Sequence, residues 1–227
     1  MAARRDDWLS NVLGYPVFAV DGAAEDVRGG GRALYYARVD AGNVATLAAF
    51  LDAGFVVVDV TVTFERAAIA APGDEADIEV ARARPEQAED LLAIAGSCFR
   101  YSRFHLDPRI PQALADTIKR EWVRSYLDQR RGTELLAATV AGRSLGFLAV
   151  LETEDATVID LVGVATEAQG TGVGSALVTA FIERHRSAGK PLRVGTQIAN
   201  VPSLRLYERL GFRVEGASYV VHLHTGG

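Results

Sequence analysis

Residues Gln169 to Ala176 read Gln-Gly-Thr-Gly-Val-Gly-Ser-Ala, and this glycine-rich run decides the fold. A stretch rich in β-branched residues, 156–164, precedes it, and the apolar spacing of an amphipathic helix follows. The glycines therefore lie at a helix N-terminus, where the first N–H groups have no partner in the helix and the dipole is positive. Glycine at positions 170, 172 and 174 leaves room for a pyrophosphate to reach the backbone. The run predicts a phosphate cradle.

Three kinds of nucleotide-binding loop have a similar glycine content, and spacing separates them. A Walker A loop needs a lysine after its last glycine, whereas Ser175 follows Gly174. A dinucleotide fingerprint needs a third glycine three positions after the second, but counting from Gly170 or Gly172 gives Ser175 or Leu177. The pattern that remains is Gln-Gly-x-Gly-x-Gly after a strand. Taken alone, it leaves open a glycine-rich turn without a ligand.

A second motif lies further along the chain. Residues 192–196 read as a buried strand, and Gly211 ends a short helix over 203–210. The segment 200–212 reads Asn-Val-Pro-Ser-Leu-Arg-Leu-Tyr-Glu-Arg-Leu-Gly-Phe. The two motifs together resemble those of the GNAT superfamily of acetyl-CoA-dependent N-acetyltransferases, Arg/Gln-x-x-Gly-x-Gly/Ala and Asn-x-x-Ala/Ser-x-x-Leu-Tyr-x-x-x-Gly-Phe.

The resemblance implies that acetyl-CoA binds along both motifs and that its acetyl group passes directly to a primary amine. Backbone amides near Val162 to Val164 would stabilise the oxyanion. The residues implied to bind the cofactor are Leu161, Val162, Gly163, Val164, Gln169, Gly170, Thr171, Gly172, Val173, Gly174, Ser175, Asn200, Ser203 and Tyr207.

Tyr207 is the predicted general acid. The thiolate that leaves during acetyl transfer needs a proton, and a phenol of pKa about 10 suits a thiolate of pKa roughly 8 to 9 in a site that excludes water. The alternative is a tyrosine packed into the core in register with Leu204, Leu206 and Leu210. The resemblance to the GNAT superfamily favours a catalytic role for Tyr207.

Asp160 is the predicted general base. It interrupts an apolar strand just before the glycine loop, on the same face as Val158 and Val162. Burial there would raise the pKa of its carboxyl group, as a general base requires. An aspartate on the solvent side of the strand, with a chain of waters as the base, is the alternative.

The sequence predicts two units, 1–72 and 77–227. An alanine-rich, acidic break with a Pro-Gly pair separates them over residues 67–77. The second unit has the order β-α-α-β-β-β-α-β-α-β, which is that of the GNAT fold. We therefore expect an α/β (α+β) fold, in which helices flank a central mixed twisted sheet.

The first unit reads as a smaller, partial GNAT-like domain. Its segment Phe50 to Phe55, followed by valines, parallels Tyr207 to Phe212. No glycine loop lies between a strand and a helix in this unit. We expect it to pack against the second unit and shape its site rather than bind coenzyme A.

A partial unit before a complete one resembles the dTDP-fucosamine acetyltransferase family, which acetylates a dTDP-linked amino-dideoxy sugar. Ser102-Arg103-Phe104 and residues 192–197 carry this likeness. It implies a nucleotide-linked amino-dideoxy sugar as the small-molecule acceptor. A protein N-terminus, another small amine, and a non-catalytic acyl-CoA sensor remain alternatives.

Four residues are predicted to contact the acceptor: Arg103, Phe104, His105 and Asp59. Arg103 and His105 would bind a diphosphate, because a guanidinium forms forked bonds to phosphate oxygens. Asp59 would orient the amine from a polar strand face that includes Thr61 and Thr63. A solvated loop arginine and a surface carboxylate are the alternatives.

Composition limits the other classes of protein to which the chain could belong. The 227 residues are 49% apolar and can bury a sizeable core, while a net charge of −5 gives no basic field for nucleic acid. One cysteine excludes an internal disulfide, and the histidine spacing predicts no metal site. Without an apolar segment long enough for a membrane span or an export signal, we expect a cytoplasmic protein, with unpaired strand edges suited to a homodimer.

Overall fold

The computed structural model describes residues 3–21, 31–67, 78–187 and 189–226. The first half of the chain forms β1 (Arg4–Arg5), α1 (Asp7–Leu13), β2 (Val17–Ala19), β3 (Ala33–Asp40), α2 (Val44–Asp52) and β4 (Val56–Arg66). The second half forms β5 (Glu79–Arg82), α3 (Ala88–Ala95), α4 (Gln112–Leu127), β6 (Glu134–Val140), β7 (Arg143–Glu152), β8 (Thr157–Val164), α5 (Val173–His185), β9 (Leu192–Gln197), α6 (Val201–Arg209) and β10 (Arg213–Thr225).

From β5 to β10 the elements follow the predicted order. Two details differ from the sequence prediction. The apolar spacing of residues 86–99 predicts one helix, but α3 ends at Ala95, and Gly96 is its C-cap, with its N–H on the Leu92 carbonyl. Helix α1 was not predicted, although Asp6 is an ordinary N-cap that accepts from the Leu9 N–H at 2.9 Å.

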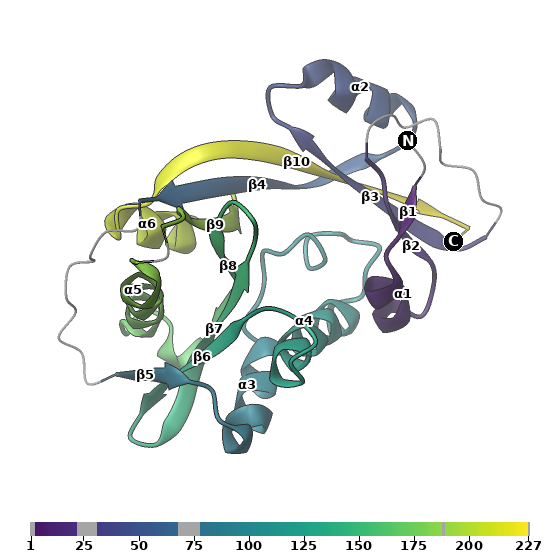
Figure 1. Cartoon of the computed structure of the whole chain (residues 1–227). Helices are drawn as coiled ribbons and strands as arrows, with labels where there is room; N and C mark the ends of the chain where they lie inside the picture. Colours follow the sequence, from purple (N-terminus) through teal and green to yellow (C-terminus); the bar gives the residue numbers. More distant parts are fainter. Residues whose placement is uncertain (1–2, 22–30, 68–77, 188, 227) are drawn as a thin grey trace.

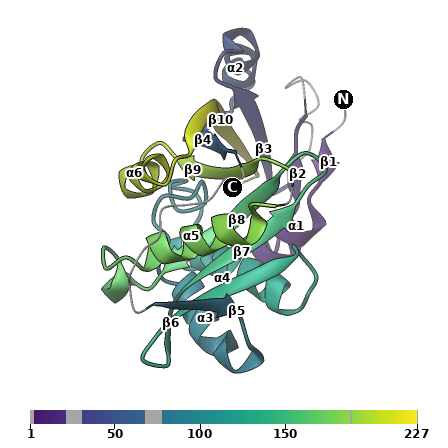
Figure 2. The ribbon, with the colours of Figure 1, turned by 60° about the vertical axis from the view of Figure 1, so that its left-hand side comes forward.

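The ten strands of the described residues form one mixed sheet, in the order β1-β2-β3-β10-β4-β9-β8-β7-β6-β5. Helix α5 covers one face of its second half, and α3 and α4 cover the other (Figures 1 and 2). The core between these layers includes Leu91, Phe147 and Phe181, all fully buried. None of the helices in the described ranges is long and apolar enough to cross a membrane.

The two halves of the chain complete one sheet by exchanging strands. Strand β4 of the first half lies between β9 and β10, where Phe64 pairs with Val194 and Val60 with Tyr219. Strand β10 of the second half lies in turn between β3 and β4. The units 1–72 and 77–227 thus share a continuous sheet, and their division stays a prediction. The predicted break falls, apart from Ala67, outside the described residues.

The two segments predicted to repeat have the same local geometry. Gly54 and Gly211 end α2 and α6 with φ angles of +91° and +83°. The next N–H reaches back to the helix at 3.0 Å in both cases, from Phe55 to the Phe50 carbonyl and from Phe212 to the Tyr207 carbonyl. This match supports the predicted half-repeat, which relates β4 to β10.

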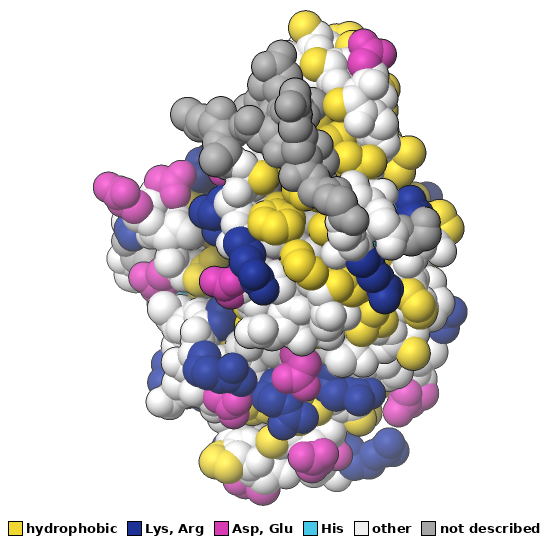
Figure 3. Space-filling view, turned by 90° about the vertical axis from the view of Figure 1, so that its right-hand side faces the viewer, with side chains coloured by type: hydrophobic (Ala, Val, Ile, Leu, Met, Phe, Trp, Pro, Cys, Tyr) yellow, Lys and Arg dark blue, Asp and Glu magenta, His cyan; other side chains and the backbone are white. Residues whose placement is uncertain are grey.

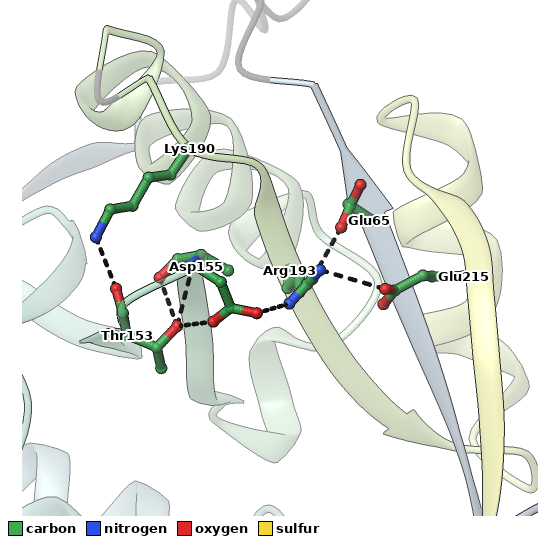
Figure 4. Close-up of polar contacts among 7 residues, drawn as sticks. Glu65, Thr153, Asp155, Lys190, Arg193 and Glu215 are labelled. Carbon is green, nitrogen blue, oxygen red and sulfur yellow. Dashed lines mark hydrogen bonds and ion pairs between the residues drawn. The ribbon is translucent and has the colours of Figure 1, made fainter.

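A charged cluster around Arg193 ties the exchanged strands together (Figure 4). From β9 its guanidinium donates to Glu65 of β4 at 2.8 Å, to Glu215 of β10 at 3.3 Å and to Asp155 at 2.6 Å. Nearby, Lys190 donates to the Thr153 carbonyl at 2.7 Å. The cluster holds the end of the sheet at which β8 and β9 are paired.

Acidic and basic side chains are interspersed over the lower part of the face shown in Figure 3. This face lies on the right of Figure 1, near α1 and the end of β10. In this view no broad field of one sign covers the described residues, which agrees with the composition.

Candidate active site

The site begins where β8 and β9 separate. The two strands pair in parallel only from Thr157 opposite Leu192 to Ile159 opposite Val194. At the same point β8 has one extra residue relative to β7, a bulge at Asp160. Beyond it, residues 161–164 do not pair with β9, and two adjoining cavities open there. The Val164 carbonyl accepts from Gln169 Nε2 at 3.3 Å.

The first cavity, the cofactor groove, has a volume of about 590 Å³ and includes the glycine loop. Gly170 and Gly172 have φ angles of +81° and +98°, which other residues rarely adopt, and a Cβ on Gly170 would meet no atom within 4 Å. The first N–H groups of α5 lie in this groove without an acceptor one turn earlier. The Arg209 guanidinium donates to the Ser175 hydroxyl at 2.9 Å beside them. Amides and a cation around open space fit a pyrophosphate.

Most residues predicted to bind the cofactor line this groove: Val162, Gly163, Val164, Gln169, Gly170, Gly172, Gly174, Ser175, Asn200 and Ser203. The side chains of Thr171 and Val173 do not, because Thr171 bonds the Ala168 carbonyl and Val173 is buried in the core. The buried Val173 offers only its backbone to a cofactor. Arg209 was missed, although a cation two residues after Tyr207 was a usable signal.

The second cavity, the acceptor pocket, has a volume of about 260 Å³ and lies at the seam between the two halves. The first half contributes Arg38, Asp59 and Thr61, and the second half contributes Leu161, Asp160, Tyr207, Arg103, Phe104, Lys119 and Trp122. Six residues line both cavities: Phe99, Ser102, Val162, Gln197, Asn200 and Ser203. The groove and the pocket are therefore neighbouring compartments.

Tyr207 reaches the acceptor pocket from α6. Its ring packs between Phe64 and Phe212, each with a centroid 5.8 Å away, and the residue is 2% exposed. Its hydroxyl has no hydrogen-bond partner in the part of the chain that the structure describes. Burial raises the pKa of the phenol well above its usual value, so it keeps its proton at neutral pH. The residue is thus both packed in the core and open to the pocket.

The expectation of a raised pKa for Asp160 is wrong. Burial acts in that direction, but the bonds and charge of Arg131, with bonds from Trp122 and Tyr126, outweigh it and hold the pKa of Asp160 below its usual range. Arg131 donates at 2.7 and 2.8 Å, and Trp122 Nε1 and Tyr126 Oη each donate at 2.7 Å. An aspartate held in this way is a poor proton acceptor.

Asp59 has the raised pKa that was expected of Asp160. It lies on β4, is 5% exposed, and burial raises its pKa against the opposing bonds from Thr61 and Gln197. The Thr61 hydroxyl donates to its carboxylate at 3.3 Å, and bonds from the Gln197 side chain and the Val60 backbone also favour the ionised form. A buried carboxylate with a raised pKa at the wall of a pocket is suited to orient an amine and accept its proton.

The three residues predicted beside Asp59 divide into two groups. Arg103 and Phe104 line the acceptor pocket. His105 does not, because its Nδ1 pairs with the Ser102 hydroxyl at 2.6 Å and its Nε2 with Asp116 at 3.0 Å. With both ring nitrogens engaged and its side chain 2% exposed, the predicted contact between His105 and a diphosphate is contradicted.

Two histidines of β10 meet a buried aspartate. His222 Nδ1 and His224 Nε2 each lie 2.7 Å from the same Asp107 oxygen. Ligands around zinc, at about 2.0 to 2.2 Å from the ion, stand further apart than this. The arrangement is a hydrogen-bonded trio in which both ring nitrogens donate. Burial lowers the pKa of His222 to about 4, so its ring is neutral and its Nε2 can accept.

Comparison with known proteins agrees with this geometry. The family model described as "Acetyltransferase (GNAT) family" matches residues 88–212, and GNAT enzymes generally use acetyl-CoA. The spore coat polysaccharide biosynthesis protein SpsD of Bacillus subtilis is 30% identical over 149 residues, which cover 65% of this chain and 51% of SpsD. The chain thus spans about half the length of this curated relative.

Two solved structures share the fold. A GCN5-related N-acetyltransferase from Sphaerobacter thermophilus has a TM-score of 0.63 at 15% identity, over 88% of this chain and 62% of that one. A conserved protein of unknown function from Staphylococcus epidermidis has a TM-score of 0.65 at 15% identity, over 96% and 88%. The motifs, the sheet and the family match lead to one conclusion: this chain belongs to the GNAT family of acetyltransferases.

Proposed function

We propose that this protein transfers the acetyl group of acetyl-CoA directly to the amine of a nucleotide-linked amino-dideoxy sugar. The observation that carries the proposal is the junction of the two cavities, with Tyr207 and Asp59 in the wall of the acceptor pocket. The name of SpsD, which refers to polysaccharide biosynthesis, supports a sugar acceptor. A pocket of about 260 Å³ lined by both halves suits a small molecule better than a protein N-terminus.

The residues divide the chemistry between them. Acetyl-CoA supplies a thioester, an activated acyl group. Asp59 orients the amine and accepts its proton, in the role first assigned to Asp160. Backbone N–H groups near Val162 to Val164, beyond the last pairing of β8 with β9, donate to the carbonyl oxygen as it gains charge. Tyr207 holds a proton for the departing sulfur. A cytoplasmic location and a homodimer stay predictions.

A coupled assay of coenzyme A release tests the proposal. Acetyl-CoA is supplied with dTDP-linked amino sugars, peptides with free N-termini, or polyamines, for the wild type and Tyr207→Phe. We expect turnover on amino sugars and a fall of about 10² to 10⁴ in kcat for the variant. Tyr219→Phe is the matched control, because Tyr219 lies on β10 and lines neither cavity.

Two results would contradict the proposal. Turnover on peptides or polyamines alone would support an acetyltransferase activity but would exclude an amino sugar as the acceptor. Binding of acetyl-CoA without turnover on any amine would favour the acyl-CoA sensor instead.

A further inference from the structure

Lys119 is a buried cation among aromatic rings. It lies on α4, is 6% exposed and lines the acceptor pocket. Its ammonium lies 4.9 Å from the ring centroid of Phe99, 5.0 Å from that of Trp122 and 5.9 Å from that of Phe104. Within the described residues it has neither a hydrogen bond nor an ion pair. Three aromatic faces compensate only part of the cost of removing an ammonium from water.

Arg103 is the second cation of the same pocket, and contacts with Tyr36 and His222 fix its position. Its guanidinium lies 3.9 Å from the Tyr36 ring centroid and 4.5 Å from that of Phe104, the ring that Lys119 also approaches. The Nη1 atom lies 3.5 Å from Nε2 of His222, whose other nitrogen is fixed by Asp107. No carboxylate lies within ion-pair distance of Arg103 in the part of the chain described here.

The charge of the pocket is unbalanced. Arg38, Arg103 and Lys119 line it, whereas Asp59 and Asp160 are its acidic residues and Asp160 is neutralised by Arg131. This excess of positive charge occurs in a chain of net charge −5. It is not explained by the cofactor's pyrophosphate, because neither Arg103 nor Lys119 lines the groove that holds the glycine loop.

We propose that the acceptor carries an anionic group, a carboxylate or a phosphate, which binds between Lys119 and Arg103 while its amine faces Asp59. This inference rests on the proposed function, since it places the anion on the molecule that is acetylated. The fork of Arg103 and the point charge of Lys119 suit the oxygens of either group. Bound there, the anion supplies the partner that Lys119 lacks, and polyamines are repelled by the same charges.

The test compares amines that differ only in the anionic group. The phosphate pair is the 1-phosphate of a 4-amino-4,6-dideoxy sugar and the methyl glycoside of that amino sugar. The carboxylate pair is 2-amino-2-deoxyglucuronic acid and glucosamine. The quantity measured is the ratio of kcat/KM between the anionic and the neutral member, for the wild type and Lys119→Met. Lys190→Met is the matched control, because Lys190 lines neither cavity.

We expect a ratio of at least about 10 in one pair for the wild type, which identifies the anion as phosphate or carboxylate. Lys119→Met should reduce that ratio about tenfold, and Lys119→Arg should restore part of it, whereas Lys190→Met should leave it unchanged. Loss of an unpaired buried charge should not lower the thermal midpoint of Lys119→Met. Equal kcat/KM within both pairs, or a ratio that survives Lys119→Met, would overturn the proposal.

A binding measurement separates this proposal from the proposed function. Calorimetric titration with the same four amines needs no turnover. If no amine is acetylated but the anionic members bind more tightly and lose that advantage in Lys119→Met, the acetylation proposal fails and the anion site stands. If neither turnover nor binding distinguishes the members of a pair, the anion site is refuted.

Discussion

Arg131 donates to both carboxylate oxygens of Asp160, with Nε 2.7 Å from Oδ2 and Nη2 2.8 Å from Oδ1. Arg131 follows α4 and Asp160 lies on β8, so the pair joins a helix layer to the sheet. We expect Asp160→Asn to lower the free energy of unfolding by about 2 to 3 kcal/mol, because the Arg131 charge loses its partner. The loss is not larger because Arg131 keeps part of its hydration. Urea denaturation measures this change. A stable variant without activity would return Asp160 to a direct role in catalysis.

The pH dependence of this pair has a definite sign. The folded-state pKa of Asp160 lies below its unfolded value, so the ionised form is favoured by folding. Its contribution to stability is complete above the unfolded pKa of about 3.9 and is lost as the pH falls through the folded pKa. The difference in unfolding free energy between wild type and Asp160→Asn should be constant from pH 7 to 5 and shrink below about pH 4. Denaturation curves at several pH values measure it.

Asp59 should respond in the opposite way. Its raised pKa means that ionisation costs stability, a cost absent below the unfolded pKa and present as the pH rises through the folded pKa. Asp59→Asn should therefore keep or raise the thermal midpoint at pH 7, while kcat/KM falls by about 10² to 10⁴. The acidic limb of the wild-type pH profile of kcat/KM should disappear in the variant. Unchanged activity in a stable variant would exclude Asp59 as the base.

Gly174 allows a test of the cradle that leaves the fold intact. A Cβ there would lie 3.5 Å from Leu206 and 3.7 Å from Val164, which are ordinary contacts. Gly174→Ala should keep or raise stability, by up to about 1 kcal/mol, since alanine favours the helix. The methyl group would enter the cofactor groove, so we expect KM for acetyl-CoA to rise about tenfold. Gly216→Ala, on β10 where a Cβ meets no atom within 4 Å, is the control. An unchanged KM would place the pyrophosphate elsewhere.

Because the two halves exchange strands, we expect each half to depend on the other for folding. Residues 77–227 expressed alone lack β4, the neighbour of both β9 and β10, and should aggregate or remain unfolded. Co-expression with residues 1–72 should give a one-to-one complex that elutes together in size-exclusion chromatography and releases coenzyme A. A folded, active 77–227 fragment would show that the units are independent.

Local signals in the sequence were reliable. The glycine loop, the helix ended by Gly211 and the element order from β5 onward follow from residue types and spacing within short windows. Strand alternation likewise identified the polar face of β4 that includes Asp59 and Thr61.

Partners from distant segments were not predictable. The low pKa of Asp160 depends on Arg131, Trp122 and Tyr126. The alternation of residues along β8 does not predict which side chains from other elements contact that strand. For the same reason Lys119 resembled any polar residue on an amphipathic helix, although three aromatic rings surround it. The exchange of β4 and β10 left no signal beyond the half-repeat.

The position of β10 also bears on when the protein can fold during synthesis. Leu34 pairs with His224, so β3 has no β10 beside it until the residues of β10 have left the ribosome. Until then β3 and β4 keep unpaired edges, and the wall of the acceptor pocket that carries Asp59 is incomplete. Pairings between residues so far apart in the chain form slowly. Closure of the sheet, and with it the acceptor pocket, is thus a late step that waits for β10, and slower growth at low temperature should increase the yield of folded protein.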